Sequence, residues 1–155
     1  MTMDVIITAV ISIISALIGF GAAWIVMQYQ FKEAKRHLCI EMYQEFDSID
    51  MLQSRFEAGK LLSEARNTKS QVLLEQLYQN VETSTGYLHL AKVLRFWERL
   101  SVMMASKRID VALAKDIFSY DYQNWKNDYL QYCKTERYQT LERISRLDQY
   151  LSASK

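Results

Sequence analysis

The stretch VIITAVISIISALIGFGAAWIVM, residues 5 to 27, decides the class of this chain. It contains no charged side chain, and its 23 residues are enough to cross a hydrocarbon core of about 30 Å as a helix. Twelve of these residues are Val, Ile, Leu or Phe. At roughly −0.3 to −0.6 kcal/mol each, they favour insertion by about 4 to 7 kcal/mol. The stretch therefore predicts a transmembrane helix, with residues 1-30 forming a membrane anchor.

A cleaved signal peptide is the main alternative, because Gly21, Ala22 and Ala23 are small residues of the kind found at cleavage sites. Signal peptides begin with a positively charged region and have an apolar core of about 7 to 15 residues. This chain begins Met-Thr-Met-Asp, and its apolar run is longer. An uncleaved anchor is therefore the favoured interpretation, and a buried soluble helix is a third.

The residues that follow the apolar stretch predict its orientation. Lys32, Lys35 and Arg36 follow it, whereas no Lys or Arg precedes it. Positive charge marks the cytoplasmic flank of a membrane helix. We therefore expect a single-pass protein of the inner (plasma) membrane, with its N-terminus outside and its C-terminal domain in the cytosol. Trp24 and Tyr29 stand where an interfacial aromatic belt is expected, so these five residues form the predicted membrane interface.

Small residues recur along the predicted membrane helix: Ala9, Ser12, Ala16, Gly19 and Ala23 at spacings of three and four, and Ser15, Gly19 and Ala23 at spacings of four. The packing row predicted from them consists of Ser12, Ser15, Ala16, Gly19 and Ala23. Small residues let two helix backbones approach closely in a bilayer. The row predicts either a homo-oligomer formed through this helix or docking onto another membrane protein. The alternative is that the row has no role, since small residues are common in membrane helices generally.

Composition restricts the rest of the chain. Among 155 residues there is no proline and there are four glycines, where average usage would give about eight and about eleven. This scarcity argues against turn-rich β-sandwiches and barrels. The formal charge of +1 provides no basic footprint for nucleic acid. We expect an all-α protein, in which residues 31-155 form a cytosolic helical bundle of about five helices.

Apolar residues at helical spacing predict the first helices of this bundle. The first carries a continuous apolar line: Leu38, Met42, Phe46, Ile49, Leu52 and Phe56. A polar connection is expected at residues 63–69, then a second helix over residues 70–81. Hydroxyl residues at 83–85 and Gly86 should end that helix and cap the next. The third has the clearest core face and should be the central element: Leu90, Val93, Trp97, Leu100 and Met104.

The C-terminal part continues the helical pattern. Asp110 is a plausible N-cap for a short helix over residues 111–118. Aromatic residues follow at spacings of three and four: Phe118, Tyr122, Trp125, Tyr129 and Tyr132. The last helix is expected at about residues 135–151, with Tyr138, Leu141, Ile144 and Leu151 at its core-facing positions. Its Glu142 and Arg146 have the favourable order of an i,i+4 pair.

Residues that carry chemistry are few and stand in no recognised spacing. The two histidines and two cysteines make no H-E-x-x-H or C-x-x-C motif, and no glycine-rich phosphate loop is present. The closest approach to a ligand set is a row of Glu33, His37, Glu41 and Glu45. A di-iron bundle needs a second such motif, so a solvated helix face is favoured. We expect no enzyme activity, no catalytic residue, no cofactor and no metal, and we expect Cys39 and Cys133 to be reduced core residues.

Two sets of residues are candidates for partner contacts. Lys92, Arg95 and Arg99 form a basic stripe that suits anionic headgroups or an acidic partner, although a solvated face is the favoured interpretation. Tyrosine and tryptophan are enriched in protein interfaces. The candidate partner surface is therefore the aromatic run Tyr120, Tyr122, Trp125, Tyr129 and Tyr132. Aromatic residues at helical spacing are more often core, and that alternative is favoured for the run as a whole.

The apolar stretch with its following cations, together with VLRFWERLSVMMASKRIDVALAKDIFSYDYQNWKNDYL from Val93 to Leu130, resembles a family of small, uncharacterised bacterial single-pass membrane proteins. The resemblance implies an N-terminal transmembrane helix, a cytosolic helical domain and no catalytic residues. The chain departs from the family pattern at Ser106-Lys107-Arg108, where a glycine would be expected.

These observations predict a non-enzymatic, membrane-anchored helical protein-interaction module with a protein partner that the sequence does not identify. The alternative is a bacterial membrane effector, of the phage-defence or toxin-like kind, that acts by oligomerisation in the membrane.

Overall fold

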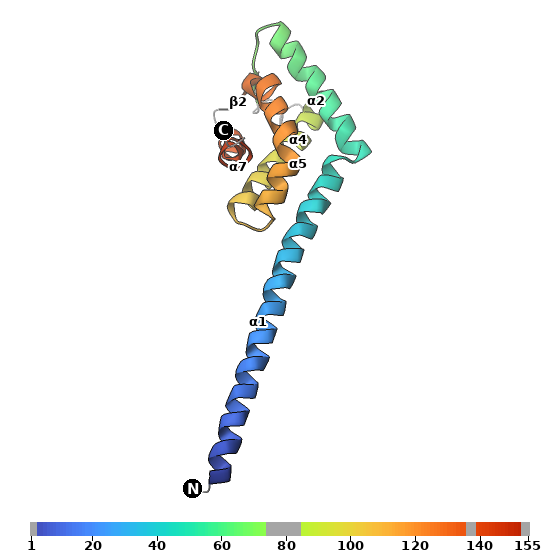
Figure 1. The fold of residues 1–155 in the computed structure, drawn as a ribbon. Helices are drawn as coiled ribbons and strands as arrows, with labels where there is room; N and C mark the ends of the chain where they lie inside the picture. The colour runs from blue at the N-terminus through green and yellow to red at the C-terminus, as the bar shows by residue number, and fades with distance from the viewer. Residues whose placement is uncertain (1–2, 74–84, 136–138, 153–155) are drawn as a thin grey trace. The chain divides into compact units, whose positions relative to one another are not determined.

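The computed structural model describes residues 3–73, 85–135 and 139–152. The fold is all-α, and its first element is a long apolar N-terminal helix, as predicted (Figure 1). The chain forms two compact units, Met1–Lys35 and Arg36–Lys155. The first is part of the long helix. The second is a helical domain with its own hydrophobic core.

Helix α1 spans Met3–Phe46, and helix α2 follows at Ile49–Asn67. The two are separate because Ser48 begins a new helix. Its hydroxyl donates to the Glu45 carbonyl at 2.7 Å and accepts from the Met51 N–H at 3.3 Å. This side-chain bond satisfies one of the unpaired N–H groups at the start of α2.

The helix break at Ser48 overturns part of the predicted core line. Leu38, Met42 and Phe46 pack in or against the core as expected, but Ile49, Leu52 and Phe56 are exposed. A two-residue interruption changes the rotational phase of the new helix, so the 3.6-residue period does not carry across it. The buried face of α2 consists instead of Met51, Ser54, Ala58, Gly59, Leu62 and Ala65.

The polar connection expected at residues 63–69 begins later than predicted, because α2 continues to Asn67 and the turn starts at Thr68. Lys69, two residues after the end of the helix, has a positive φ of 51°. The N–H groups of Lys69 and Ser70 donate to the carbonyls of Arg66 and Ala65 at 3.1 and 2.9 Å. This pattern is a Schellman motif, in which the left-handed position usually holds glycine.

The predicted helix over residues 70–81 is wrong at its start. Val72–Leu73 form a short strand, β1, that pairs in parallel with β2, Cys133–Lys134, with Val72 opposite Cys133. Residues 74–84, which include the rest of that predicted helix and part of the predicted hydroxyl-rich cap, lie outside the described residues.

Helix α4, Thr85–Ala105, has the core face that its spacing predicts. All five predicted core residues are fully buried: Leu90, Val93, Trp97, Leu100 and Met104. The helix contacts α2 on one side and the C-terminal helices α6 and α7 on the other. It is therefore the central element of the helical domain, as expected.

The turn after α4 repeats the Schellman geometry. Lys107 has a φ of 53°, and the N–H groups of Lys107 and Arg108 donate to the Met104 and Met103 carbonyls at 3.1 and 3.0 Å. The structure thus places the left-handed residue within the three positions where a glycine was expected. Ile109 is buried, and the Asp110 side chain accepts from the N–H groups of Ala112 and Leu113, both at 3.1 Å. The predicted N-cap is confirmed.

The C-terminal elements differ from the prediction in their bounds. Helix α5 is one helix, Val111–Asp128, where a short helix ending at residue 118 was expected. A 3-10 turn, η1, follows at Leu130–Tyr132. The last predicted helix begins later and divides in two, α6 at Thr140–Ser145 and α7 at Leu147–Leu151; Tyr138 lies outside the described residues. The predicted Glu142–Arg146 pair is present at 3.1 Å.

Aromatic rings from three helices meet in the core of the helical domain. The Phe46 ring lies 5.2 Å from Trp97 and 5.7 Å from Phe118, in both cases with an edge-to-face geometry. Trp97 also contacts Tyr122 at 5.5 Å. Such pairs stabilise a fold beyond the area that they bury. The C-terminal end of α1 is therefore part of the core of the second unit.

Candidate membrane anchor and interaction surfaces

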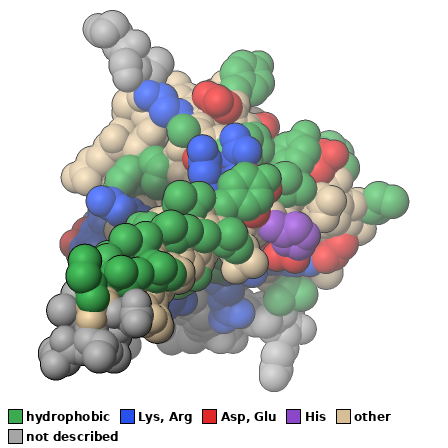
Figure 2. Space-filling view, turned by 60° about the horizontal axis from the view of Figure 1, so that its bottom comes forward, with side chains coloured by type: hydrophobic (Ala, Val, Ile, Leu, Met, Phe, Trp, Pro, Cys, Tyr) green, Lys and Arg blue, Asp and Glu red, His purple; other side chains and the backbone are tan. Residues whose placement is uncertain are grey.

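The apolar part of α1 is long and apolar enough to cross a membrane. It is the one such helix among the described residues, with a mean hydropathy of 2.3 in its most apolar window. Its described side chains between Ile7 and Phe31 are exposed, and its hydrophobic residues form a continuous surface in Figure 2. Water solvates such a surface poorly, whereas a bilayer covers it while the helix satisfies its own backbone hydrogen bonds. A signal sequence meets the same criteria of length and composition.

Within the described part of the first unit, no other side chains cover the predicted packing row. All five of its residues are exposed: Ser12, Ser15, Ala16, Gly19 and Ala23. A Cβ atom built on Gly19 meets no atom within 4 Å. The Ser12 hydroxyl donates to the Thr8 carbonyl at 2.9 Å. Its hydrogen-bonding demand is therefore met within the helix, which leaves a smooth surface of small residues.

The predicted interface residues divide between the two units. Trp24, Tyr29, Lys32 and Lys35 belong to the first unit, and the two aromatic side chains are exposed. Arg36 begins the second unit, where its Nε atom lies 3.5 Å from Asp110 Oδ2. A basic residue expected at the membrane interface therefore forms an ion pair with the residue that caps α5.

The predicted aromatic partner surface is not one surface. Tyr122 and Trp125 are buried in the core, whereas Tyr120 is 77% exposed, and Tyr129 and Tyr132 are half-buried. The Tyr122 hydroxyl donates to the Ile144 carbonyl at 3.2 Å. Burial, with a smaller contribution from Asp148, raises the pKa of Tyr122 above its usual range. Of the five residues, Tyr120 is the most accessible to a partner.

Sequence reasoning missed a second exposed apolar surface, on α2. Ile49, Leu52 and Phe56 follow each other at spacings of three and four, and their exposed fractions are 85%, 43% and 63%. Contiguous apolar side chains on a protein surface mark interaction sites. Ser48 could have revealed this surface from the sequence. Serine is favoured at helix N-caps, so it indicates that a new helix starts there and that its apolar face has a different rotational phase.

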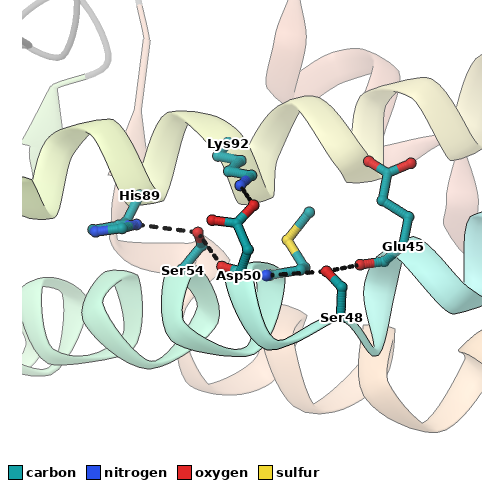
Figure 3. Close-up of polar contacts among 7 residues, drawn as sticks. Glu45, Ser48, Asp50, Ser54, His89 and Lys92 are labelled. Carbon is teal, nitrogen blue, oxygen red and sulfur yellow. Dashed lines mark hydrogen bonds and ion pairs between the residues drawn. The ribbon is translucent and has the colours of Figure 1, made fainter.

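The basic stripe borders a groove of about 450 Å³ at the α2–α4 side of the domain. Lys92 pairs with Asp50 and Arg99 pairs with Glu45 (the Lys92 pair is drawn in Figure 3). Arg95 lies between these two cations along α4 and is exposed. The apolar part of its lining consists of Met51, Leu88, Ala91 and Phe96. Neighbouring carboxylates therefore neutralise much of the charge that the sequence alone suggested.

A set of polar contacts links Asp50 and Ser54 of α2 with His89 and Lys92 of α4 (Figure 3). The buried Ser54 hydroxyl donates to the Asp50 carbonyl at 2.8 Å, and His89 Nδ1 lies 3.1 Å from the same hydroxyl oxygen. Because the hydroxyl has one proton to donate, His89 Nδ1–H acts as donor to Ser54. This contact joins α2 to α4, and sequence reasoning assigned no role to His89.

Within the row considered for metal chemistry, His37 and Glu41 contact each other and Glu45 pairs with a cation of another helix. His37 Nδ1 lies 3.3 Å from Glu41 Oε1, whereas Glu45 binds Arg99. Among the described residues, no group of three or more His, Cys, Asp or Glu side chains could hold a metal ion.

Both cysteines are buried and free. Desolvation, together with the charge of Asp110, raises the pKa of Cys39 to about 11. Burial raises the pKa of Cys133 to about 12. Since the thiolate is the nucleophilic form, neither thiol is activated.

Comparisons with family models, with curated proteins and with solved structures found no match to this chain.

Proposed function

We propose that this chain is a non-enzymatic, membrane-anchored protein-interaction module of the bacterial inner membrane. One observation carries the proposal: α1 presents an apolar surface long enough to cross a bilayer, and its last turns enter the core of a helical domain. The three basic residues that follow the apolar stretch, Lys32, Lys35 and Arg36, support a cytosolic location for the helical domain.

Two exposed apolar features of the helical domain support a role in protein interaction. These are the row of Ile49, Leu52 and Phe56 on α2, and Tyr120 on α5. Burial raises the pKa of both free thiols, which disfavours nucleophilic chemistry by either cysteine.

Site-specific photocrosslinking in bacteria tests this function. A photoreactive phenylalanine analogue replaces Phe56 or Tyr120, and Gln149, which is exposed on α7, is the control position. We expect a discrete crosslinked protein at Phe56 or Tyr120 and none at Gln149. Protease added to spheroplasts should leave the helical domain intact until the membrane is lysed. Digestion before lysis contradicts the orientation, and no crosslink at either apolar site contradicts the interaction role.

The second candidate function is a membrane effector that acts by oligomerisation. The exposed row of small residues in α1, with open space at Gly19, favours it. Cysteines placed at Ser15 or Gly19 should crosslink between copies on oxidation in membranes, whereas a cysteine at Ile14, on the opposite helix face, should not. Equal crosslinking at all three positions, or unchanged membrane potential on overexpression, counts against the effector.

A further inference from the structure

The turn between α4 and α5 carries two adjacent cations. Lys107 and Arg108 are both exposed. Within the described part of the chain, neither takes part in an ion pair, whereas the nearby cations Arg143 and Arg146 pair with Glu98 and Glu142. The turn therefore presents a net positive charge to solvent.

Two observations place this turn beside the first residues of α1 in the second unit. The Asp110 carboxylate lies 3.5 Å from Arg36 Nε. The charge of Asp110 also contributes to the raised pKa of Cys39, one turn further along α1. Since successive Cα atoms are about 3.8 Å apart, Lys107 and Arg108 lie within about 11 Å of Asp110 along the backbone.

The covalent chain limits how far this turn can lie from the membrane. Arg36 follows Met27, the last residue of the apolar stretch, by nine residues. Nine helical residues span about 13 Å, and headgroups extend about 5 to 7 Å beyond the hydrocarbon core on each side. The remaining gap is comparable to the Debye length of about 8 Å at physiological salt. The Arg36–Asp110 ion pair is therefore about one Debye length from the headgroups, and the backbone of Lys107 and Arg108 lies within about 11 Å of Asp110.

We propose that the α4–α5 turn, through Lys107 and Arg108, docks onto the anionic surface of the bilayer that holds α1. The inference rests on the proposed membrane anchor, and it assigns the turn a lipid partner rather than a protein one. Each cation near an anionic surface shifts the docked population about fivefold, and two shift it about thirtyfold. The turn would thus hold the helical domain in contact with acidic lipid.

Arg66 and Lys69, at the C-terminal end of α2, provide a matched control. They are also exposed, and Lys69 has the same left-handed backbone and Schellman hydrogen bonds as Lys107. They lie at the end of α2 away from its junction with α1. Removing them changes net charge equally and perturbs the same kind of turn.

The test uses the full chain in nanodiscs of phosphatidylcholine alone or of phosphatidylcholine with 30% phosphatidylglycerol. A donor fluorophore is attached at Ala112→Cys, which is exposed in the first turn of α5, and an acceptor is attached to a small fraction of headgroups. The native thiols are buried and should not label. Energy transfer is compared among three proteins that carry this reporter: the otherwise unchanged chain, Lys107→Gln/Arg108→Gln and Arg66→Gln/Lys69→Gln.

We expect higher transfer in the anionic discs than in the neutral ones, and we expect 0.5 M salt to abolish the difference. Lys107→Gln/Arg108→Gln should lose the lipid dependence, whereas Arg66→Gln/Lys69→Gln should keep it within about twofold. Equal transfer in both lipids, or equal loss in the two double variants, overturns the docking. A chain that fails to co-elute with discs refutes the anchor itself, so the two failures are distinguishable.

Discussion

Placing two lysines in the middle of the apolar stretch tests the membrane anchor most directly. Ile14 and Leu17 lie near its centre, and both side chains are exposed in the structure. Each substitution replaces about −0.3 to −0.6 kcal/mol with about +2.5 to +3.5 kcal/mol. Ile14→Lys/Leu17→Lys therefore costs about 6 to 8 kcal/mol, which offsets the estimated 4 to 7 kcal/mol gained by the whole stretch. One lysine, at about 3 to 4 kcal/mol, should leave insertion favourable or balanced.

The helical domain offers a closely matched control for this variant. Ile49 and Leu52 have the same residue types at the same spacing, and both are exposed on α2. Ile49→Lys/Leu52→Lys adds the same charge to the chain without touching the apolar stretch. Exposed substitutions of this kind change stability by about 0.5 kcal/mol or less.

Alkaline carbonate extraction of bacterial membranes provides the assay. We expect the unmodified chain and Ile49→Lys/Leu52→Lys to stay in the membrane pellet, and Ile14→Lys/Leu17→Lys to move to the soluble or aggregated fraction. The single variant Ile14→Lys should stay largely in the pellet. If the double variant in α1 resists extraction as fully as its control does, the apolar stretch is not what holds the chain in the membrane.

Three further outcomes follow from the helical domain. Lys69→Gly and Lys107→Gly should each stabilise the domain by about 0.5 to 1 kcal/mol, since glycine accepts the left-handed backbone without strain; a thermal midpoint in detergent that rises about 2 to 4 °C agrees with this, and a fall does not. Asp110→Ala removes the cap of α5 and should destabilise by about 1 kcal/mol, whereas an unchanged midpoint would show that the cap is dispensable. Cys39 and Cys133, whose pKa values rise to about 11 and 12, should resist maleimide at pH 8. Relative to an ordinary thiol, thiolate is reduced on the order of a hundredfold at Cys39 and a thousandfold at Cys133. Rapid labelling of the folded protein contradicts their burial, and labelling after denaturation is the control.

The sequence was most informative where one segment decides its own structure. The apolar stretch, the α4 core face from Leu90 to Met104 and the Asp110 cap all depend on local spacing or on one side chain, and the structure has all three. The prediction that Ile49, Leu52 and Phe56 are core residues was wrong. Their spacing continues the apolar period of α1, but the helix breaks after Phe46, and the new helix has a different rotational phase. Ser48 was the local sign of that break.

The interaction surfaces were less predictable because their residues come together from distant parts of the chain. The basic stripe reads as three cations in a row, but Glu45 and Asp50 neutralise two of them from 54 and 42 residues away. The hydrogen bond between Ser54 and His89 and the pairing of Val72 with Cys133 are equally non-local. The aromatic run divided between core and surface for the same reason, since only the positions of neighbouring helices decide which rings are covered.

The contribution of α1 to the domain core has a consequence for the order of events during synthesis. Cys39, Met42 and Phe46 are core residues, but Phe118, which contacts the Phe46 ring, is made 72 residues later. At a synthesis rate of about 5 to 20 residues per second, Phe118 is added about 4 to 14 s after Phe46. On the proposed topology, the apolar stretch enters the bilayer during this interval, so every copy of the domain completes its folding while already attached to the membrane.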